Sequence, residues 1–598
     1  MQKPHFLITL VLSFLANLAI AQPKIDAKKL DKKLEALREL TQTAGFSVAV
    51  VYKDEILYTK GFGYRDVAQK LKADEHTLYP IGSSSKAFTT ALLGIMEEEH
   101  DFSFEVSPRE YLPNLKFYND ELNNKVTVLD MISHRTGLPR HDYSWYLFPT
   151  QNRDSLLARV EYQEPFTGLR EKWYYNNFMY LAQGMISEKL TDKTWEDNIR
   201  EYFLAPLDMK SSNVSIAELQ KSANAAKGYR LQDFEETILM PYYDIAAMGP
   251  AGAINSSVYE MSNWLKLWLN EGKYNDQQII PKSYIARAQN PLMLLGKGVS
   301  DPQFPGLHLN SYGYAWFTSS FNGHYRMEHG GNIDGFSANV CLFPSDDIGI
   351  VVLCNQNTSA LPGLARNLIS EMVLGLEETD WHELYEKQIN EAKESMKKME
   401  DQAPEETVYS GVAHNLVDYQ GYYYHPGYGK FKIYLQNDSL YARFPLDTSY
   451  LKPLHYDIFE AYAVENNRVD TSGGSGEKIN FQTNDLGDIA SVKIKMEAML
   501  DPIVFDRSPL DLKMDASDLE QFVGNYTLAG TNLKVSVKDG VLRLFVPSQP
   551  EYSLTPISKN EFSIKGLTGY KVRFETRDGK EEIVLLQPNG TFRAEKEG

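Results

Sequence analysis

The sequence has little cysteine: Cys341 and Cys354 are the only two among its 598 residues. A small fold built around disulfides and a metal site built from cysteine pairs are therefore excluded. Both cysteines fall in predicted neighbouring strands, residues 337–343 and 348–354, where a bridge between them is geometrically awkward. We expect two buried free thiols.

Long apolar runs are also scarce. Residues 6–20 form one, preceded by Lys3 and His5, and Ala19-Ile20-Ala21 at its end supplies small residues at the cleavage spacing before Gln22. This pattern is typical of a secretory signal peptide covering residues 1–21, and a membrane anchor is the alternative because a span needs about 20 apolar residues. No later stretch is long enough to span. We expect a periplasmic or secreted protein with no integral membrane segment after signal cleavage.

Basic residues are outnumbered, since 80 Asp and Glu face 61 Lys and Arg, giving a formal net charge of −19. Such a surface repels a phosphate backbone, so nucleic acid is not expected as a partner. Hydrophobic residues at 43% and charged residues at 24% are typical of a globular protein. The length predicts several domains, at roughly 150 residues each.

The order of predicted elements indicates a sheet assembled from two distant parts of the chain. A helix is predicted over residues 26–43 and a strand hairpin over 46–52 and 56–61, before a mostly helical stretch that runs to about residue 290. Further elements are then predicted: strands over 312–317, 325–329, 335–343 and 349–354, and a helix over 361–376. This pattern favours one antiparallel sheet with a helical subdomain inserted between its halves.

The C-terminal part of the chain is different in character. Residues 379–412 are highly charged and are predicted to form a helical linker. Beyond it, alternating aromatic and β-branched residues with Asn-Asp and Asp-Gly turns predict all-β structure. The motif at residues 419–423 recurs at 522–526, so we predict two tandem β domains, residues 413–510 and 511–598.

Three short motifs carry the chemistry. In Ser83-Ser84-Ser85-Lys86 the serine and lysine are three residues apart, which places both side chains on one face of a helical turn. Serine is a weak nucleophile at neutral pH, and a lysine of lowered pKa is an established way to activate it. Alone, this spacing is also common by chance.

The other two motifs are Tyr175-Asn176-Asn177 and His329-Gly330-Gly331-Asn332. A phenol can relay a proton and an amide can bind a substrate amide. Glycines on a strand let a substrate backbone lie close, and the N–H of Asn332 can stabilise an oxyanion together with that of Ser83. Each motif alone is as well explained by packing.

Together and in this order, the motifs resemble the serine β-lactamase and penicillin-binding-protein superfamily, in its class C-like, D-aminopeptidase-like and esterase-like branch. The resemblance covers residues 25–375 and includes Ser133-His134-Arg135-Thr136-Gly137-Leu138-Pro139, which we interpret as a packing element. It implies an α+β fold: a β-lactamase-like antiparallel sheet flanked by helices over residues 22–378. The C-terminal half resembles the small lipocalin-like all-β domains appended to such hydrolases.

The resemblance also implies roles. Ser83 is the expected nucleophile, Lys86 its base or proton relay, and Tyr175 the group that protonates the leaving group and activates water. Asn177, His329 and Gly331 are expected to bind substrate, and the backbone N–H groups of Ser83 and Asn332 to form the oxyanion hole. No metal or cofactor is implied.

His329 stands where many relatives in the superfamily have lysine. Histidine is largely neutral near pH 7, so penicillin-like substrates with a carboxylate are disfavoured relative to neutral esters, amides or D-amino-acid peptides.

The leading hypothesis is an exported serine hydrolase that forms an acyl-enzyme on Ser83 and acts on a small-molecule or peptide substrate. Because an acyl-enzyme does not dictate its acceptor, an acyltransferase to a small alcohol or amine is an alternative. A slowly acylated receptor of cell-wall peptides or β-lactams, without turnover, is another. The sequence leaves the oligomeric state open.

Overall fold

The structure is a computed structural model that describes residues 23–597 apart from 233, 297, 300–305, 402–410, 466–467, 470–476, 486, 511–513 and 568. The predicted signal peptide, residues 1–21, lies outside the described residues. Among the described residues, no helix combines the length and the apolar character needed to cross a membrane. The chain divides into two compact units. One combines the residues up to Asn114 with Glu121–Leu138 and Phe166–Lys393, and the other combines Leu115–Asp120, Pro139–Pro165 and Glu394–Gly598.

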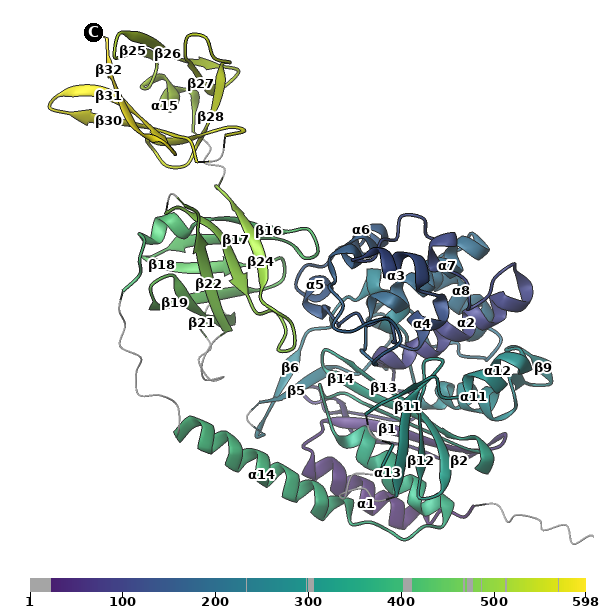
Figure 1. Ribbon diagram of the computed structural model, residues 1–598. Coiled ribbons are helices and arrows are strands. Elements are labelled where there is room, and N and C mark those ends of the chain that lie inside the picture. Colours follow the sequence, from purple (N-terminus) through teal and green to yellow (C-terminus); the bar gives the residue numbers. More distant parts are fainter. Residues whose placement is uncertain are drawn as a thin grey trace, which may run out of the picture. The chain divides into compact units, whose positions relative to one another are not determined.

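The first unit is built on an antiparallel sheet with strand order β10-β11-β12-β13-β14-β15-β1-β2-β3 (Figure 1). The pairing of β15 with β1, in which Val50 lies opposite Ile350, joins the two distant parts of the chain. The strands are β1 (Gly45–Tyr52), β2 (Glu55–Asp66), β3 (Leu71–Lys72), β10 (Met293–Leu294), β11 (Leu307–Tyr312), β12 (Phe317–Phe321), β13 (His324–Ile333), β14 (Phe336–Phe343) and β15 (Ile348–Cys354). This is the predicted two-part sheet.

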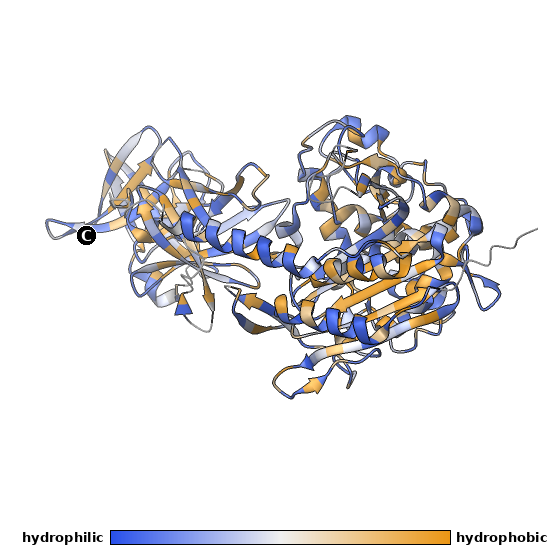
Figure 2. Ribbon diagram, turned by 90° about the horizontal axis from the view of Figure 1, so that it is seen from below, coloured by the Kyte–Doolittle hydropathy of each residue, from blue (hydrophilic) through white to orange (hydrophobic). Residues whose placement is uncertain are grey.

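Helices cover the sheet because its central strands are apolar on both faces. On one face α1 (Ala27–Leu40) and α13 (Leu361–Leu374) bury their leucines against alternate residues of β1 and β15. On the other face, Leu265 of α11 (Val258–Leu269) packs on Gly349 of β15. Figure 2 shows the sheet strands largely in the orange of apolar residues and stretches of blue on the surrounding helices.

The inserted subdomain is mostly helical, as predicted. Its elements in the first unit are η1 (Gly82–Ser85), α2 (Lys86–Glu99), α4 (Val128–Ile132), α7 (Phe178–Thr191), α8 (Trp195–Ile199), α9 (Ile216–Leu219), α10 (Gly249–Gly252) and α12 (Lys282–Ala288), with the short strand pairs β4 (Tyr79–Pro80) and β7 (Asn255–Ser256), β5 (Gly228–Gln232) and β6 (Glu236–Met240), and β8 (Lys273–Tyr274) and β9 (Gln277–Gln278).

One predicted strand is wrong. Residues 312–317 form the turn between β11 and β12, with Tyr312 ending one strand and Phe317 beginning the next. Gly313 and Trp316 are joined by a backbone hydrogen bond of 2.9 Å, and Ala315 has φ +63°. The apolar run of this segment therefore reflects a buried turn, not an extended chain.

The two cysteines are free and buried on β14 and β15, as predicted.

The second unit contains two β-barrels, which agrees with the predicted tandem β domains. The strands of the first are β16 (Gly421–His425), β17 (Gly429–Gln436), β18 (Ser439–Arg443), β19 (Thr448–His455), β20 (Ile458–Glu465), β21 (Arg468–Val469), β22 (Glu477–Thr483), β23 (Ile489–Ile494) and β24 (Ile503–Ser508), and the β19–β20 pairing closes the sheet. The second barrel closes through β25 (Gly524–Leu528), β26 (Thr531–Lys538), β27 (Val541–Phe545), β28 (Tyr552–Pro556), β29 (Glu561–Ile564), β30 (Lys571–Arg577), β31 (Lys580–Gln587) and β32 (Gly590–Lys596).

The repeat seen in the sequence has a structural counterpart. Tyr423 donates its hydroxyl to the carbonyl of Tyr419 at 2.7 Å, and Tyr526 donates to that of Phe522 at 2.9 Å. The hairpin turns after β17 and β26 both have two consecutive residues with positive φ, which suits the twist of a tight hairpin. The same local interactions therefore build both barrels.

Residues Pro139–Pro165 leave the first unit and pack in the second. This segment carries α5 (Asp142–Tyr146) and α6 (Arg153–Leu157), and Phe148 belongs to the buried core of the first barrel. Ser144 donates to the carbonyl of Gly427 at 2.7 Å, and His141 Nδ1 lies 2.8 Å from the hydroxyl of Tyr428.

The charged stretch after residue 379 is helical, as predicted, and forms α14 (Trp381–Asp401).

Candidate active site

The segment from β4 to α2 places Ser83 beside Lys86. Gly82 has φ +52°, which turns the chain sharply between Ile81 and the short helix η1. Ser83 then lies one turn before Lys86, the first residue of α2. The Lys86 Nζ donates to Ser83 Oγ at 3.0 Å, as the three-residue spacing predicted.

Lys86 makes two further hydrogen bonds. Its Nζ donates to Asn177 Oδ1 at 2.7 Å and to the carbonyl of Ala251 at 2.8 Å, and the side chain is fully buried. These hydrogen bonds hold Nζ between Ser83, Asn177 and Ala251. Burial disfavours the charged form of a lysine, which is the physical condition for its use as a base.

The loop before α7 carries Tyr175 and Asn177. Asn177 is the residue that immediately precedes α7, and it is 6% exposed. Tyr175 is partly exposed, and its ring centroid lies 4.9 Å from Lys86 Nζ. The structure therefore gathers Ser83, Lys86, Tyr175 and Asn177, from segments about ninety residues apart, around one ammonium nitrogen.

An ion-pair clamp holds this loop against the turn that follows α4. The buried carboxylate of Asp130 accepts from Arg135 Nε at 2.6 Å and from Arg170 Nε at 2.8 Å. Burial alone would raise the pKa of Asp130, but hydrogen bonds from Arg170 and Thr127 and the charge of Arg135 hold it below its usual range. Both arginines thus stay paired, and the loop start is fixed.

Strand β13 borders the site with Gly331 and Asn332. A Cβ on Gly331 would lie 1.9 Å from the Ile81 carbonyl oxygen and 3.1 Å from the Ser83 backbone nitrogen. A Cβ on Gly82 would lie 2.9 Å from the Asn332 nitrogen. The strand therefore runs directly against the backbone that leads into Ser83, and the N–H groups expected to form an oxyanion hole lie on these two adjoining segments.

His329 is buried at 2% exposure, and its ring has two defined partners. Nδ1 donates to the Gly330 carbonyl at 2.6 Å, so the neutral ring accepts at Nε2 from the Tyr312 hydroxyl at 3.1 Å. Burial and the neighbouring charge of Lys86 lower the pKa of His329 to about 3, although its bond to Gly330 favours the charged ring. His329 is therefore neutral at physiological pH.

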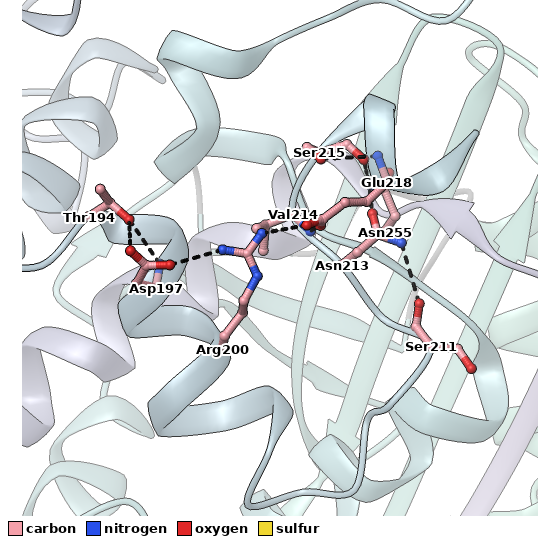
Figure 3. A network of polar contacts seen from close by, with 9 residues as sticks. All are labelled: Thr194, Asp197, Arg200, Ser211, Asn213, Val214, Ser215, Glu218 and Asn255. Carbon is pink, nitrogen blue, oxygen red and sulfur yellow. Dashed lines mark hydrogen bonds and ion pairs between the residues drawn. The ribbon is translucent and has the colours of Figure 1, made fainter. Parts of the chain in front are cut away.

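Figure 3 shows a polar network that includes Asn255 of β7, the strand that pairs with β4. Asn255 of β7 donates to Asn213 Oδ1 at 2.8 Å and pairs opposite Pro80 of β4. Glu218 accepts a hydrogen bond from Arg200 at 2.8 Å and another from the backbone N–H of Val214, next to Asn213, at 3.4 Å. The segment just before Gly82 and Ser83 is thereby fixed by side chains of the helical subdomain.

Sequence reasoning did not identify several residues that build the site. Ala251 contributes only a carbonyl, and a backbone acceptor leaves no signature in its residue type. Asp130 and Arg170 are forty residues apart, and nothing in the local pattern pairs them. His134 is visible in the sequence as a polar residue of the segment Ser133–Pro139, but the sequence alone indicates only a packing role for this segment.

The fold and the arrangement of the three motifs define a protein of the β-lactamase and penicillin-binding-protein class. The family model described as Beta-lactamase matches residues 30–370, more than half of the chain, and the chain belongs to this family. A second model, described as Domain of unknown function (DUF3471), matches residues 406–507, which include the first barrel.

Two relatives are similar to this chain over part of its length. Protein flp of Staphylococcus aureus (strain MW2) is 26% identical over 331 residues, which is 55% of this chain and 63% of that protein. Unguisins hydrolase ungD' of Aspergillus campestris is 28% identical over 418 residues, 65% of this chain and 74% of that protein. The chain thus spans less than two thirds of the length of Protein flp.

Among solved structures, the octameric penicillin-binding protein homologue from Pyrococcus abyssi superposes with a TM-score of 0.53 at 21% identity. The match covers 81% of this chain and 100% of that one. At this identity the likeness concerns the fold.

Proposed function

We propose that the protein is an exported serine hydrolase that forms an acyl-enzyme on Ser83. The observation that carries the proposal is the buried Lys86 Nζ, held within hydrogen-bond distance of both Ser83 Oγ and Asn177 Oδ1. A nucleophile and a base at this distance, with the base oriented by a third group, form the general arrangement of an activated serine. The name of the fungal relative, a hydrolase, supports the same chemistry.

In the proposed reaction, neutral Lys86 accepts the hydroxyl proton as Ser83 Oγ bonds to the substrate carbonyl carbon. The backbone N–H groups of Ser83 and Asn332 stabilise the negative charge on the carbonyl oxygen. Collapse of this intermediate breaks the bond to the leaving group, which takes a proton from Tyr175. The Tyr175 phenolate then takes a proton from water as the water oxygen bonds to the acyl carbon, the bond from that carbon to Ser83 Oγ breaks, and the proton on Lys86 returns to Ser83 Oγ.

The substrate class follows from the chemistry around His329. A neutral, buried imidazole provides no fixed cation for a substrate carboxylate, so we propose neutral esters, amides or D-amino-acid peptides as substrates. Asn177, His329 and Gly331 are proposed to line the substrate's path.

The test is a panel of chromogenic esters, D-aminoacyl anilides and a cephalosporin, assayed with the wild-type protein and Ser83→Ala. We expect steady turnover of at least one ester or anilide by the wild-type protein and its loss, by about 10³-fold or more, in Ser83→Ala. A burst without steady turnover would instead support a slowly acylated receptor. Turnover that rises with an added alcohol or amine would support an acyltransferase. Unchanged turnover in Ser83→Ala would refute the proposal.

A further inference from the structure

His134 makes the contacts that fix the backbone around Tyr175. It follows α4 with φ +54° and is fully buried. Its carbonyl accepts the N–H of Tyr174 at 2.9 Å, and its ring Nδ1 accepts the N–H of Asn176 at 3.2 Å. The peptide N–H groups on either side of Tyr175 are therefore both bound by one residue.

The imidazole also contacts the Tyr175 side chain. The two ring centroids lie 4.3 Å apart at an interplanar angle of 38°. Because an N–H group donates to Nδ1, the neutral ring carries its proton on Nε2. The rings of Tyr180 and Tyr312, at 5.1 and 5.0 Å, pack around the same imidazole and limit its rotation.

His134 is itself held in place. Thr127 and Asp130 form a reciprocal capping box at the start of α4, and Asp130 also binds Arg135, the residue after His134. The arrangement is stiff from α4 through His134 to the loop of Tyr175. Displacement of a catalytic group by about 1 Å can cost about 10²-fold in rate, so such stiffness has a direct use.

We propose that His134 is a positioning residue that sets the phenol of Tyr175 for proton delivery to the leaving group. This inference rests on the proposed function, since it needs Tyr175 to act on an acyl-enzyme formed at Ser83. It assigns to His134 a task that packing alone does not require: bonding to the backbone on both sides of Tyr175.

Two variants distinguish the hydrogen bond that His134 accepts from Asn176 from the ring contact that it makes with Tyr175. His134→Phe keeps a ring against Tyr175 and removes the acceptor for Asn176, whereas His134→Asn places an amide oxygen near the former Nδ1 and removes the ring. Asparagine also tolerates the left-handed backbone at this position better than phenylalanine does. Thermal unfolding of each variant checks folding, and His141→Phe is the control for loss of a buried histidine in the other unit.

The deciding readout is the ratio of acylation rates with 4-nitrophenyl acetate and phenyl acetate, which share an acyl group. The first has a good leaving group and the second needs a proton from the enzyme. We expect His134→Phe to slow acylation by phenyl acetate about 10²-fold and by 4-nitrophenyl acetate less than tenfold, with KM nearly unchanged. His134→Asn is expected to retain a ratio close to that of the wild-type protein, as is His141→Phe.

A double variant completes the test. In the Tyr175→Phe background, His134→Phe is expected to add little further loss, because the two residues act through one phenol. An unchanged leaving-group ratio in His134→Phe, or fully additive losses in the double variant, would overturn the inference. If Ser83→Ala kept its activity, the proposed function would fail instead, so the two failures are distinguishable.

Discussion

The Lys86 side-chain nitrogen lies 2.7 Å from Asn177 Oδ1 and 3.0 Å from Ser83 Oγ, so one buried nitrogen links the nucleophile to the loop that carries Tyr175. This position explains why a single lysine is expected to be indispensable. Removing it would leave Ser83 without a base and would remove the donor bound by Asn177.

Substitution of Lys86 should therefore abolish activity. We expect Lys86→Ala to lower kcat/KM by about 10³-fold or more, and Lys86→Arg to restore little, because a guanidinium does not give up its proton in proteins. The measurement is the rate of ester hydrolysis, with Lys189→Ala, an exposed lysine on α7, as control. Substantial activity in Lys86→Arg would contradict a role for Lys86 as base.

Two adjacent glycines on β13 are expected to respond differently to alanine. In Gly331→Ala the new Cβ would lie 1.9 Å from the Ile81 carbonyl oxygen, so the strand must move away from Ser83. In Gly330→Ala the nearest atom would be 3.5 Å away, which is ordinary contact. We expect Gly331→Ala to lose at least about tenfold in kcat/KM and Gly330→Ala to stay near wild type. Equal behaviour of the two variants would show that the close approach of β13 to the nucleophile segment is not required.

Acid is expected to destabilise the fold through His329. Its ring is protonated below about pH 6.5 in the unfolded chain but only below about pH 3 in the folded protein. The unfolded state thus binds more protons between these values, and the free energy of unfolding falls as the pH is lowered from 6.5 towards 3. From pH 7 to pH 5 this one group contributes a loss of up to about 2 kcal/mol.

The measurement is urea unfolding of the wild-type protein and His329→Asn at both pH values. The variant is expected to show a smaller acid-induced loss of stability, while His76→Asn, which removes an exposed histidine, should match the wild-type loss. His141, whose pKa burial lowers to about 4, adds a similar effect that both proteins share. An acid-induced loss in His329→Asn as large as in the wild-type protein would show that the ring is not held neutral.

Removal of the C-terminal half should lower the solubility of the fragment that remains. A chain cut after residue 378 would lack the first barrel, whose core includes Phe148 and whose Tyr428 lies against His141. We expect this fragment to be less soluble than the full-length protein and to recover solubility when the cut is moved to after residue 510. Phe148→Ala in the full chain is expected to cost about 3–5 kcal/mol of stability, measured by denaturant unfolding. A soluble, fully active fragment ending at residue 378 would show that Pro139–Pro165 needs no barrel to cover it.

Much of this structure could be predicted because its signals are local. The spacing of Ser83 and Lys86, the apolar runs of β1 and β15 and the repeated Tyr423 and Tyr526 each depend on neighbouring residues. Three features could not be predicted because they depend on tertiary position. The Ala251 carbonyl accepts from Lys86, Asp130 pairs with Arg170, and the segment Pro139–Pro165 packs in the second unit. The strand predicted over residues 312–317 was wrong because this buried turn is as apolar as a strand.

The central claim is that Ser83 carries the acyl group. Its most direct test is rapid acid quenching of the protein with a 4-nitrophenyl ester, followed by peptide mass spectrometry of the wild-type protein and Tyr175→Phe, in which slow deacylation should accumulate the intermediate. We expect one acyl group on the peptide that contains Ser83 and none in Ser83→Ala. An acyl group on another residue, or turnover by Ser83→Ala at the wild-type rate, would contradict it.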